Sequence, residues 1–298
     1  LMGESKHGQG VTIFENDSVK FFHENDGIAI FSLKTKLHTL NLEVIDSLKQ
    51  AIAISEQEFK AMIIWQDSTP FCAGANLYEI VAGAKLGMID HQNLYTKFKK
   101  KAWQLLKPKL PNIDNLKPIN EVIELLQCVL MSLKYSKIPI VAADEGLALG
   151  GGCELALLCD IVICGENAQF GTPEIKIAAF PGDGGTQRLP RLIGKARAMY
   201  MVLTGERINA DMACNWGLVS EVLPSGETVN RALKIAETIA EYSPIALEMV
   251  KAEVLMSFSK PLDESLSLER QLLLWQTEDH DEGIAAFLEK RKPRYTGR

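Results

Sequence analysis

The sequence lacks the features that would place it outside the cell or in a membrane. None of its six cysteines forms a Cys-x-x-Cys pair or a metal-binding spacing with histidine, which disfavours disulfide frameworks and zinc sites. No apolar run is long enough to span a bilayer, and residues 1–10 carry no apolar signal core. We therefore expect a cytoplasmic protein in a reducing environment, without a membrane span or a bound metal.

An excess of basic charge is also missing. The chain has 32 lysines and arginines against 38 acidic residues, a net charge of −6, and this balance disfavours a nucleic-acid partner. No Gly-x-Gly-x-x-Gly motif opens a strand–helix unit, which disfavours a nicotinamide-dependent dehydrogenase for this segment. The chain as a whole has 47% apolar and 23% charged residues, which is the composition of an ordinary globular protein.

Short apolar stretches alternate with helical patterns along the first two thirds of the chain. Residues 19–22 and 27–33 predict a hairpin around a turn at 24–27. The segment 40–57 has apolar residues at helical spacing, and 61–66 is typical of a buried strand. Strand, helix and strand in this order indicate an α/β fold with parallel pairing.

A second unit of this kind surrounds a glycine turn. Residues 138–143 and 160–164 predict buried strands with a short helix at 153–159 between them. The glycines therefore lie where a strand ends and a helix begins, and ligands favour such places in α/β folds. After about residue 190 the pattern is almost wholly helical and apolar on one face, which predicts packing on the core or on another subunit.

The run GLALGGGCELALLCD (146–160), followed by AQFGTPE (168–174), contains the candidate chemistry. Gly150, Gly151 and Gly152 leave the backbone open to a ligand, although a tight structural turn would need the same residues. FCAGANL (71–77) is another small-residue turn after a buried strand. Two such turns can direct two N–H groups at one oxygen and stabilise an oxyanion.

Two glutamates follow these glycines. Glu154 lies three residues after Gly151, on the same side of a first helical turn. Its negative charge there could equally serve only to interact favourably with the helix dipole. Glu174 could be a solvated loop acid. Two acids in different surroundings can hold different protonation states, as paired acid and base chemistry requires.

The segment 138–194 resembles the signature region of the crotonase family, the enoyl-CoA hydratases and isomerases. FCAGANL resembles its first oxyanion loop, and residues 203–224 and 286–298 resemble its later segments. The resemblance implies a crotonase-like spiral of ββα units with a C-terminal helical region, commonly assembled as a homotrimer or a dimer of trimers. It divides the chain into a flexible leader (1–18), a core (19–199) with a long helical insertion at about 77–137, and a helical oligomerisation or lid region (200–298).

The resemblance also implies roles for individual residues. The amides of Ala75 and Gly151 would form an oxyanion hole for a thioester carbonyl, and Glu154 and Glu174 would be the two catalytic glutamates. Our own assignment takes Glu154 as the base that activates water and Glu174 as the acid that protonates Cα, and the reverse order stays open because coupled acids titrate as a pair. It implies that the following residues contact the acyl-CoA: Lys36, Ala73, Asn76, Leu77, Gly150, Pro173, Gly182 and Lys290, with Lys292 as a further phosphate contact. The reaction implied is the syn-addition of water to trans-2-enoyl-CoA in fatty-acid β-oxidation, with no cofactor and with the coenzyme A thioester as substrate.

Some features leave alternatives open. Retention of Glu154 favours hydration over the isomerisation of 3-enoyl-CoA, which in this family can use the Glu174 position alone, and a noncatalytic acyl-CoA-binding module is a third alternative. Asp183 stands where a small or apolar residue is common in the family. It is either a surface turn residue or a third carboxylate that lines the pocket. The long 77–137 connection resembles the hydratase segment of proteins fused to a 3-hydroxyacyl-CoA dehydrogenase, and Leu1 is not an initiator methionine, so a larger parent chain is expected.

Overall fold

Two β-sheets organise the chain in the computed structural model, which describes all residues except 1–9, 26, 67, 77–116 and 262–267. The larger sheet has the order β1-β2-β3-β4-β5-β7-β10, and the smaller has the order β6-β8-β9. The strands are β1 (Val11–Glu15), β2 (Val19–Asn25), β3 (Ile28–Leu33), β4 (Ala61–Trp65), β5 (Ile140–Asp144), β6 (Leu147–Leu149), β7 (Ile161–Gly165), β8 (Gln169–Gly171), β9 (Arg207–Asn209) and β10 (Glu221–Leu223). The helices are η1 (Lys36–His38), α1 (Leu42–Glu58), α4 (Lys117–Lys134), α5 (Gly151–Ala156), η4 (Pro173–Ile177), α6 (Gly185–Ile193), α7 (Lys195–Thr204), α8 (Ala210–Trp216), α9 (Thr228–Ala240), α10 (Pro244–Met256), α12 (Leu268–Leu274) and α13 (Glu278–Glu289).

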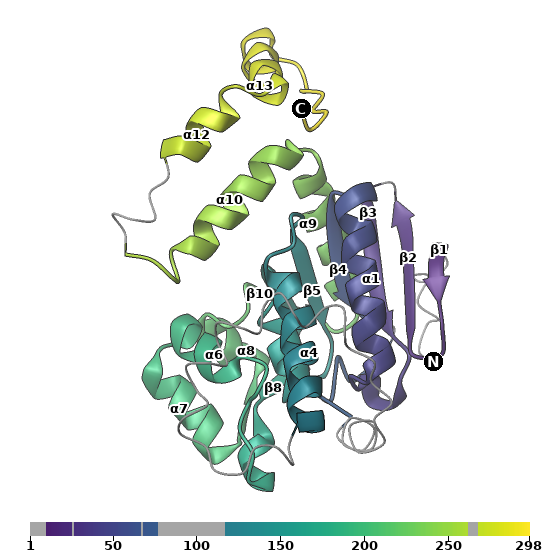
Figure 1. Ribbon diagram of the computed structural model, residues 1–298, viewed down its shortest axis with the longest axis vertical. Coiled ribbons are helices and arrows are strands. Elements are labelled where there is room, and N and C mark those ends of the chain that lie inside the picture. The colour runs from purple at the N-terminus through teal and green to yellow at the C-terminus, as the bar shows by residue number, and fades with distance from the viewer. Residues whose placement is uncertain (1–9, 26, 67, 77–116, 262–267) are drawn as a thin grey trace.

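Both faces of the larger sheet are buried. Figure 1 shows α1 and α4 on one face and α9 on the other. Along β3 the side chains alternate, so that Ala29 and Phe31 join the cluster under α1 and α4, while Ile28 and Ile30 join the cluster under α9. Strands β3, β4, β5, β7 and β10 pair in parallel, and the continuous apolar run of β3 reflects burial on both faces.

The chain repeatedly crosses from the larger sheet to the smaller sheet and then into a helix. β5, β6 and α5 follow this order, and β7, β8 and the helices η4 to α7 repeat it. Isolated bridges Leu40↔Ala75 and Cys72↔Ala148 extend the same pairing to the segment after β4. The expected α/β spiral of ββα units is confirmed.

The structure differs from the expected division of the chain at two places. Strand β1 lies inside the leader expected at 1–18, because Ile13 and Phe14 pack against the core and β1 pairs with β2. The core also continues past residue 199, since β10 pairs with β7 and α9 covers the larger sheet. Strands of three residues carry too little periodicity to be recognised in a sequence. Of the insertion expected at 77–137, residues 77–116 lie outside the described part and α4 follows them.

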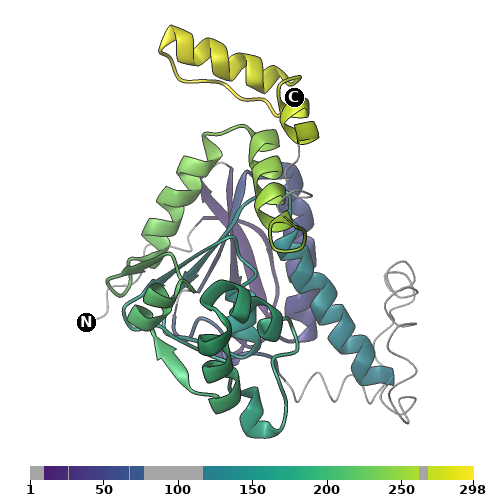
Figure 2. The same cartoon turned by 90° about the vertical axis from the view of Figure 1, so that its left-hand side faces the viewer.

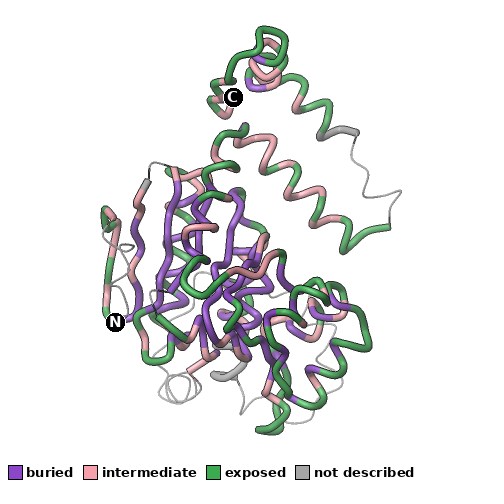
Figure 3. Tube along the Cα trace, turned by 180° about the vertical axis from the view of Figure 1, so that it is seen from behind, coloured by how far each residue is buried: buried purple, intermediate pink, exposed green. Residues whose placement is uncertain are grey.

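The C-terminal helices α12 and α13 stand off the body beyond α10 (Figure 2). Lys251 of α10 anchors that helix to the core, because its Nζ lies 2.7 Å from Asp160 Oδ2 in an ion pair that is largely buried. At the start of α13, Asp279 accepts a 2.6 Å hydrogen bond from Ser243, the N-cap residue of α10. We call the segment of α12 and α13 the C-terminal arm. In Figure 3 buried residues concentrate in the sheets, while the C-terminal arm is mostly exposed or intermediate.

Among the described residues, no helix is both long and apolar enough to cross a membrane.

Candidate active site

Backbone hydrogen bonds bring the two small-residue turns side by side. The Cys72 amide donates to the carbonyl of Leu147 at 3.0 Å, and the Leu149 amide donates back to the carbonyl of Cys72 at 3.0 Å. The turn after β4 therefore continues the smaller sheet next to β6. Gly152 permits this approach, because a Cβ at that position would lie 2.2 Å from the Cys72 carbonyl oxygen.

The amides of Ala75 and Gly151 lie together at the end of these paired segments. A Cβ on Gly151 would be 3.4 Å from the Ala75 nitrogen, and a Cβ on Gly74 would be 3.4 Å from the Gly151 nitrogen. Gly151 begins α5, so its N–H has no intrahelical acceptor. In the part of the chain that the structure describes, neither amide donates a backbone hydrogen bond, and the two donors have the proximity an oxyanion hole requires.

Glu154 lies one turn along α5 with its side chain turned inward. Its residue exposure is 1%, and its Oε1 accepts a 2.6 Å hydrogen bond from the Gly185 amide. Burial, together with the negative charge of Asp183 and against the opposing hydrogen bond from Gly185, raises the pKa of Glu154 to about 8. A buried carboxyl of this kind holds its proton at neutral pH.

Glu174 approaches the same glycine turn from η4. Gly150 has a positive φ of 55°, which favours glycine, and a Cβ there would be 2.9 Å from Glu174 Oε1, so a side chain would displace the carboxylate. Glu174 Oε2 is buried without a hydrogen-bond partner among the described residues. Burial raises the pKa of Glu174, and its residue is more exposed than Glu154.

Asp183 also faces this site. Its Oδ2 would lie 3.8 Å from a Cβ on Gly151, and its residue is only partly exposed. Burial raises the pKa of Asp183 to about 6, and the nearby Arg188 guanidinium opposes the shift. Asp183 thus lies in a partly exposed turn with its carboxylate toward the Gly151 backbone, and its role as a third carboxylate of the pocket stays a prediction.

The other expected contact residues divide into three groups. Near the glycine turns lie Ala73, Asn76, Gly150 and Pro173, and Gly182 is exposed beside Asp183. Lys36 lies on η1, whose neighbour Leu37 accepts a 3.1 Å hydrogen bond from the Ala73 amide, so that η1 borders the first turn. Leu77 lies outside the described residues.

Lys290 and Lys292 are not brought to this site within one chain. Lys290 caps α13 in a left-handed conformation, and Figure 1 shows α13 at the opposite end of the molecule from β8 and α6. Lys292 pairs with Glu241 at 3.1 Å.

Sequence reasoning missed Arg188. Its Nη1 donates a 2.5 Å hydrogen bond to the backbone carbonyl of Asp183, and its Nη2 lies 2.9 Å from the sulfur of Met131 on α4. An arginine five residues after an aspartate, inside a helix, is a common surface pattern. The only signal in the sequence was its place in GDGGTQR, three residues after the glycine pair.

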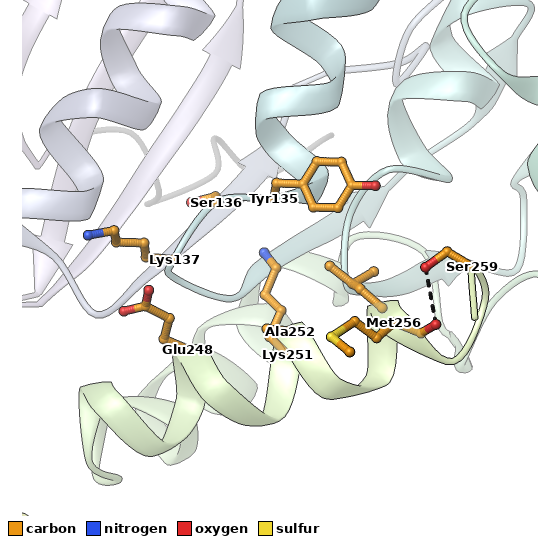
Figure 4. Close-up of a pocket in the computed structure, with 9 residues that line it drawn as sticks. Tyr135, Ser136, Lys137, Glu248, Lys251, Ala252, Met256 and Ser259 are labelled. Carbon is orange, nitrogen blue, oxygen red and sulfur yellow. Dashed lines mark hydrogen bonds between the residues drawn. The ribbon is translucent and has the colours of Figure 1, made fainter. Parts of the chain in front are cut away.

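Two clefts lie elsewhere on the molecule. One, of about 230 Å³, lies between the end of α4 and α10 and is lined by Tyr135, Lys251 and Met256 (Figure 4). A neighbouring cleft of about 440 Å³ lies between α10 and α6. Neither is lined by Glu154 or Glu174. Among the described residues, no group of three histidine, cysteine or acidic side chains is arranged to hold a metal ion.

Comparisons with known proteins agree with this geometry. Residues 114–298 match the family model described as enoyl-CoA hydratase/isomerase. The chain is 53% identical over 162 residues to 2,3-dehydroadipyl-CoA hydratase of Escherichia coli K12, covering 54% of this chain and 64% of that protein. It is 39% identical over 256 residues to the mitochondrial enoyl-CoA hydratase of Pongo abelii, covering 85% of this chain and 77% of that protein.

The fold is similar to that of solved family members. An enoyl-CoA hydratase from Bacillus anthracis superposes with a TM-score of 0.78 at 31% identity, covering 94% of this chain and all of that chain. The chain matches less than two thirds of the length of the Escherichia coli relative. The family match and the long alignment to the Pongo abelii protein nevertheless agree, and the chain belongs to the enoyl-CoA hydratase/isomerase family, the crotonases.

Proposed function

We propose that this chain hydrates trans-2-enoyl-CoA thioesters to 3-hydroxyacyl-CoA. One observation carries the proposal: the adjacent amides of Ala75 and Gly151 lie beside the carboxyls of Glu154 and Glu174. If the thioester carbonyl oxygen accepts hydrogen bonds from both amides, the conjugated alkene of the substrate lies next to the two acids. The names of the relatives, which are hydratases of CoA thioesters, support this reaction.

The two amides supply the electrophilic activation. An enoyl thioester reacts with water only when its carbonyl is polarised, and negative charge builds on the oxygen as water attacks Cβ. Each well-placed N–H donor is worth about 2.7–4 kcal/mol to such a transition state. Because the donors are backbone groups in a hydrogen-bonded turn, they require little reorganisation during the reaction.

The acids move the protons. Water forms a C–O bond to Cβ and loses one proton to an ionised carboxylate, while a protonated carboxyl transfers its proton to Cα. The acids therefore hold the same number of protons after each turnover. Positioned acid and base groups of this kind contribute about 10²–10⁴-fold to the rate.

Burial raises the pKa of both Glu154 and Glu174, so the pair holds a proton at rest that either acid can carry to Cα. Burial and the neighbouring Asp183 favour the neutral form of Glu154. Glu174 lies in a more exposed position, and burial and the negative charge of Asp183 raise its pKa as well. Since the acids are coupled, the site titrates as a unit.

Substrate binding involves residues around the same turns. Ala73, Asn76, Leu77, Gly150, Pro173 and Gly182 are proposed to contact the acyl-CoA, with Lys36 on its phosphates. Lys290 could serve such a role only toward another subunit's site or after movement of the arm. No cofactor is required by this chemistry, since the thioester and water supply every atom.

We also propose that the chain assembles as a homotrimer or a dimer of trimers. The C-terminal arm exposes large apolar side chains that a single chain leaves uncovered, including Trp275 at 66%, Phe287 at 81% and Leu288 at 73% exposure. A second exposed apolar surface lies on η4 and the residues after it, at Ile177 and Phe180. Contiguous apolar surface of this kind marks protein contacts. A fused 3-hydroxyacyl-CoA dehydrogenase would consume the product, and such a parent chain stays a prediction.

All six cysteines are free, which supports a reducing intracellular compartment. The cytoplasm is the compartment expected from the sequence, and the Pongo abelii relative is named as mitochondrial.

The test is turnover of short, medium and long trans-2-enoyl-CoA thioesters, followed by loss of the conjugated absorbance. A parallel assay supplies 3-enoyl-CoA, which becomes conjugated only if the chain is an isomerase. Hydration without conjugation of the 3-enoyl substrate supports the proposal. Acyl-CoA binding with neither reaction would support the noncatalytic alternative.

A further inference from the structure

The backbone of Leu40 sets the direction of the Ala75 amide. The two residues form an isolated parallel bridge, in which the Leu40 amide donates to the Gly74 carbonyl at 2.9 Å and the Asn76 amide donates to the Leu40 carbonyl at 2.8 Å. In a parallel pairing of this kind the residue between the two bonded neighbours turns its own N–H to the opposite side. The Ala75 amide therefore faces away from Leu40 and stays free beside the Gly151 amide.

The residues before Leu40 hold the earlier part of the same turn. The Ala73 amide donates to the Leu37 carbonyl at 3.1 Å, and His38 Nδ1 lies 2.5 Å from the Pro70 carbonyl oxygen. Because a carbonyl oxygen can only accept, Nδ1 carries the hydrogen of this bond. The bond from His38 is made by a side chain, so a substitution can remove it, whereas the three other bonds named here are made by the backbone.

His38 and Leu37 adopt backbone conformations that L residues rarely take. Their φ angles are 51° and 56°, and a left-handed backbone is unfavourable by roughly 1–2 kcal/mol for each such residue. The two residues turn the chain so that the backbone groups of Leu37 and Leu40 both reach the turn at 70–76. His38 is only 8% exposed, so water competes little for its hydrogen bond, and this bond opposes relaxation of the strained segment.

We propose that His38 is a positioning residue of the oxyanion hole. Its hydrogen bond to the Pro70 carbonyl holds the left-handed segment against the turn at 70–76, and this segment in turn aims the Ala75 amide at the place where the thioester oxygen would lie. In this role His38 contacts no reacting atom. Its effect on the rate rests on the proposed hydration, whereas the aim of the Ala75 amide can be measured without turnover.

Three substitutions at His38 separate the hydrogen bond from the backbone conformation. His38→Asn places an amide N–H where Nδ1 stands, His38→Asp has the same shape without a donor, and His38→Gly removes the side chain without adding charge. Asparagine, aspartate and glycine all tolerate a left-handed backbone. The control is Thr39→Val, which removes a hydroxyl that bonds to the Lys36 carbonyl within the same segment at 3.2 Å.

The first measurement is kcat for a short trans-2-enoyl-CoA. His38→Gly and His38→Asp should lower kcat about tenfold or more, toward the 10²–10³-fold loss that follows removal of one oxyanion donor. Binding of saturated butyryl-CoA, measured by calorimetry, should change less than about threefold, because the lost interaction strengthens mainly in the transition state. His38→Asn and Thr39→Val should keep kcat within about threefold of the wild type. An equal loss in His38→Asn, or a loss in His38→Asp alone, would overturn the proposal.

The second measurement needs no turnover. Infrared difference spectroscopy of bound butyryl-CoA, labelled with carbon-13 at its thioester carbonyl, follows the stretch of that carbonyl, and hydrogen bonds from the two amides lower its frequency. Most of this lowering should disappear in His38→Gly and His38→Asp and remain in His38→Asn. The same lowering in all three variants would show that His38 does not aim the Ala75 amide.

The two measurements separate two kinds of failure. If the carbonyl frequency depends on the donor at position 38 but the wild type hydrates no enoyl-CoA, the proposed function fails and the positioning role stands. If the wild type hydrates enoyl-CoA and the variants without the donor keep both kcat and the carbonyl frequency, the positioning role is overturned and the proposed function stands. Loss of the folded state in both His38→Gly and His38→Asp, seen by circular dichroism, would assign the bond to stability alone and would also overturn the positioning role.

Discussion

The Gly185 amide donates a 2.6 Å hydrogen bond to Glu154 Oε1 across two helices that are distant in sequence. A Cβ on Gly185 would lie 3.1 Å from that oxygen and 2.8 Å from the Pro181 Cβ. The glycine therefore allows both the bond and the close turn. This contact links the helix that begins with the oxyanion donor Gly151 to the turn that carries Asp183.

Replacing either glutamate should remove most activity. Glu154→Gln and Glu174→Gln keep the shape of the side chain and remove its ability to exchange a proton, so kcat should fall about 10²–10⁴-fold. Coenzyme A thioester binding, measured by calorimetry, should change little. Glu166→Gln serves as the exposed control. Full activity in either glutamate variant would contradict the assignment of these two acids.

Gly152→Ala should destabilise the fold. The added Cβ would meet the Cys72 carbonyl oxygen at 2.2 Å and the Cys72 Cβ at 2.7 Å, so the two paired turns must separate. We expect a loss of about 3 kcal/mol or more in the free energy of unfolding measured with urea. Gly283→Ala is the matched helical control, because its nearest neighbour is the movable hydroxyl of Tyr295 at 3.2 Å. A control that loses as much as Gly152→Ala would show that the close approach is not the cause.

Asp144 is a buried acid that weakens the fold. Both of its carboxyl oxygens lack a partner among the described residues, and burial raises its pKa well above the ordinary value. Because the folded pKa is above the unfolded one, the penalty is absent below about pH 4 and grows as the pH rises. Asp144→Val should therefore be more stable than the wild type by at least about 1–3 kcal/mol at pH 7, with the difference shrinking toward pH 4.

The same substitution at Asp160, another largely buried aspartate, should have the opposite effect on stability. Its Oδ2 accepts hydrogen bonds from the Ile140 amide at 2.8 Å and lies 2.7 Å from Lys251 Nζ. Asp160→Val should destabilise the chain by about 3–5 kcal/mol, because it leaves the buried Lys251 ammonium without its anionic partner and with only the Ile138 carbonyl as an acceptor. Equal effects of the two aspartate substitutions would contradict this explanation.

The C-terminal arm should control assembly. Phe287→Glu with Leu288→Glu places two charges on an apolar surface of α13, where they would have to be desolvated in a subunit contact. Light scattering coupled to size-exclusion chromatography should show a shift from the oligomer toward smaller species. Gln276→Glu adds charge at an exposed polar position and should keep the oligomer. An unchanged mass in the double variant would place the contact elsewhere.

Much of this site is predictable because its signals are local. Gly150 has a positive φ that favours glycine, and Gly152 leaves no room for a Cβ. The prediction of a strand end and a helix start around these glycines is confirmed. Helix caps are equally local. The Asn209 side chain accepts a hydrogen bond from the Met212 amide at the start of α8, and the Ser243 side chain accepts one from the Ala246 amide at the start of α10. The hairpin of β2 and β3 is confirmed for the same reason.

The rest depends on contacts between distant segments. β6, β8 and β9 have three residues each, too few to show a period, and they exist because each pairs with a neighbour that is remote in sequence. The direction of the Asp183 side chain depends on Arg188 and Gln127, which hold the turn by its backbone. Neither contact follows from spacing along the chain.

The most direct test of the proposed reaction is incubation of a trans-2-enoyl-CoA with the chain in ¹⁸O-enriched water, followed by mass spectrometry of the thioester. If Ala75 and Gly151 polarise the carbonyl while Glu154 and Glu174 move the protons, the product carries one heavy oxygen at C3, and Glu154→Gln slows its formation about 10²–10⁴-fold. A thioester that binds yet gains no heavy oxygen in the wild type would contradict the account.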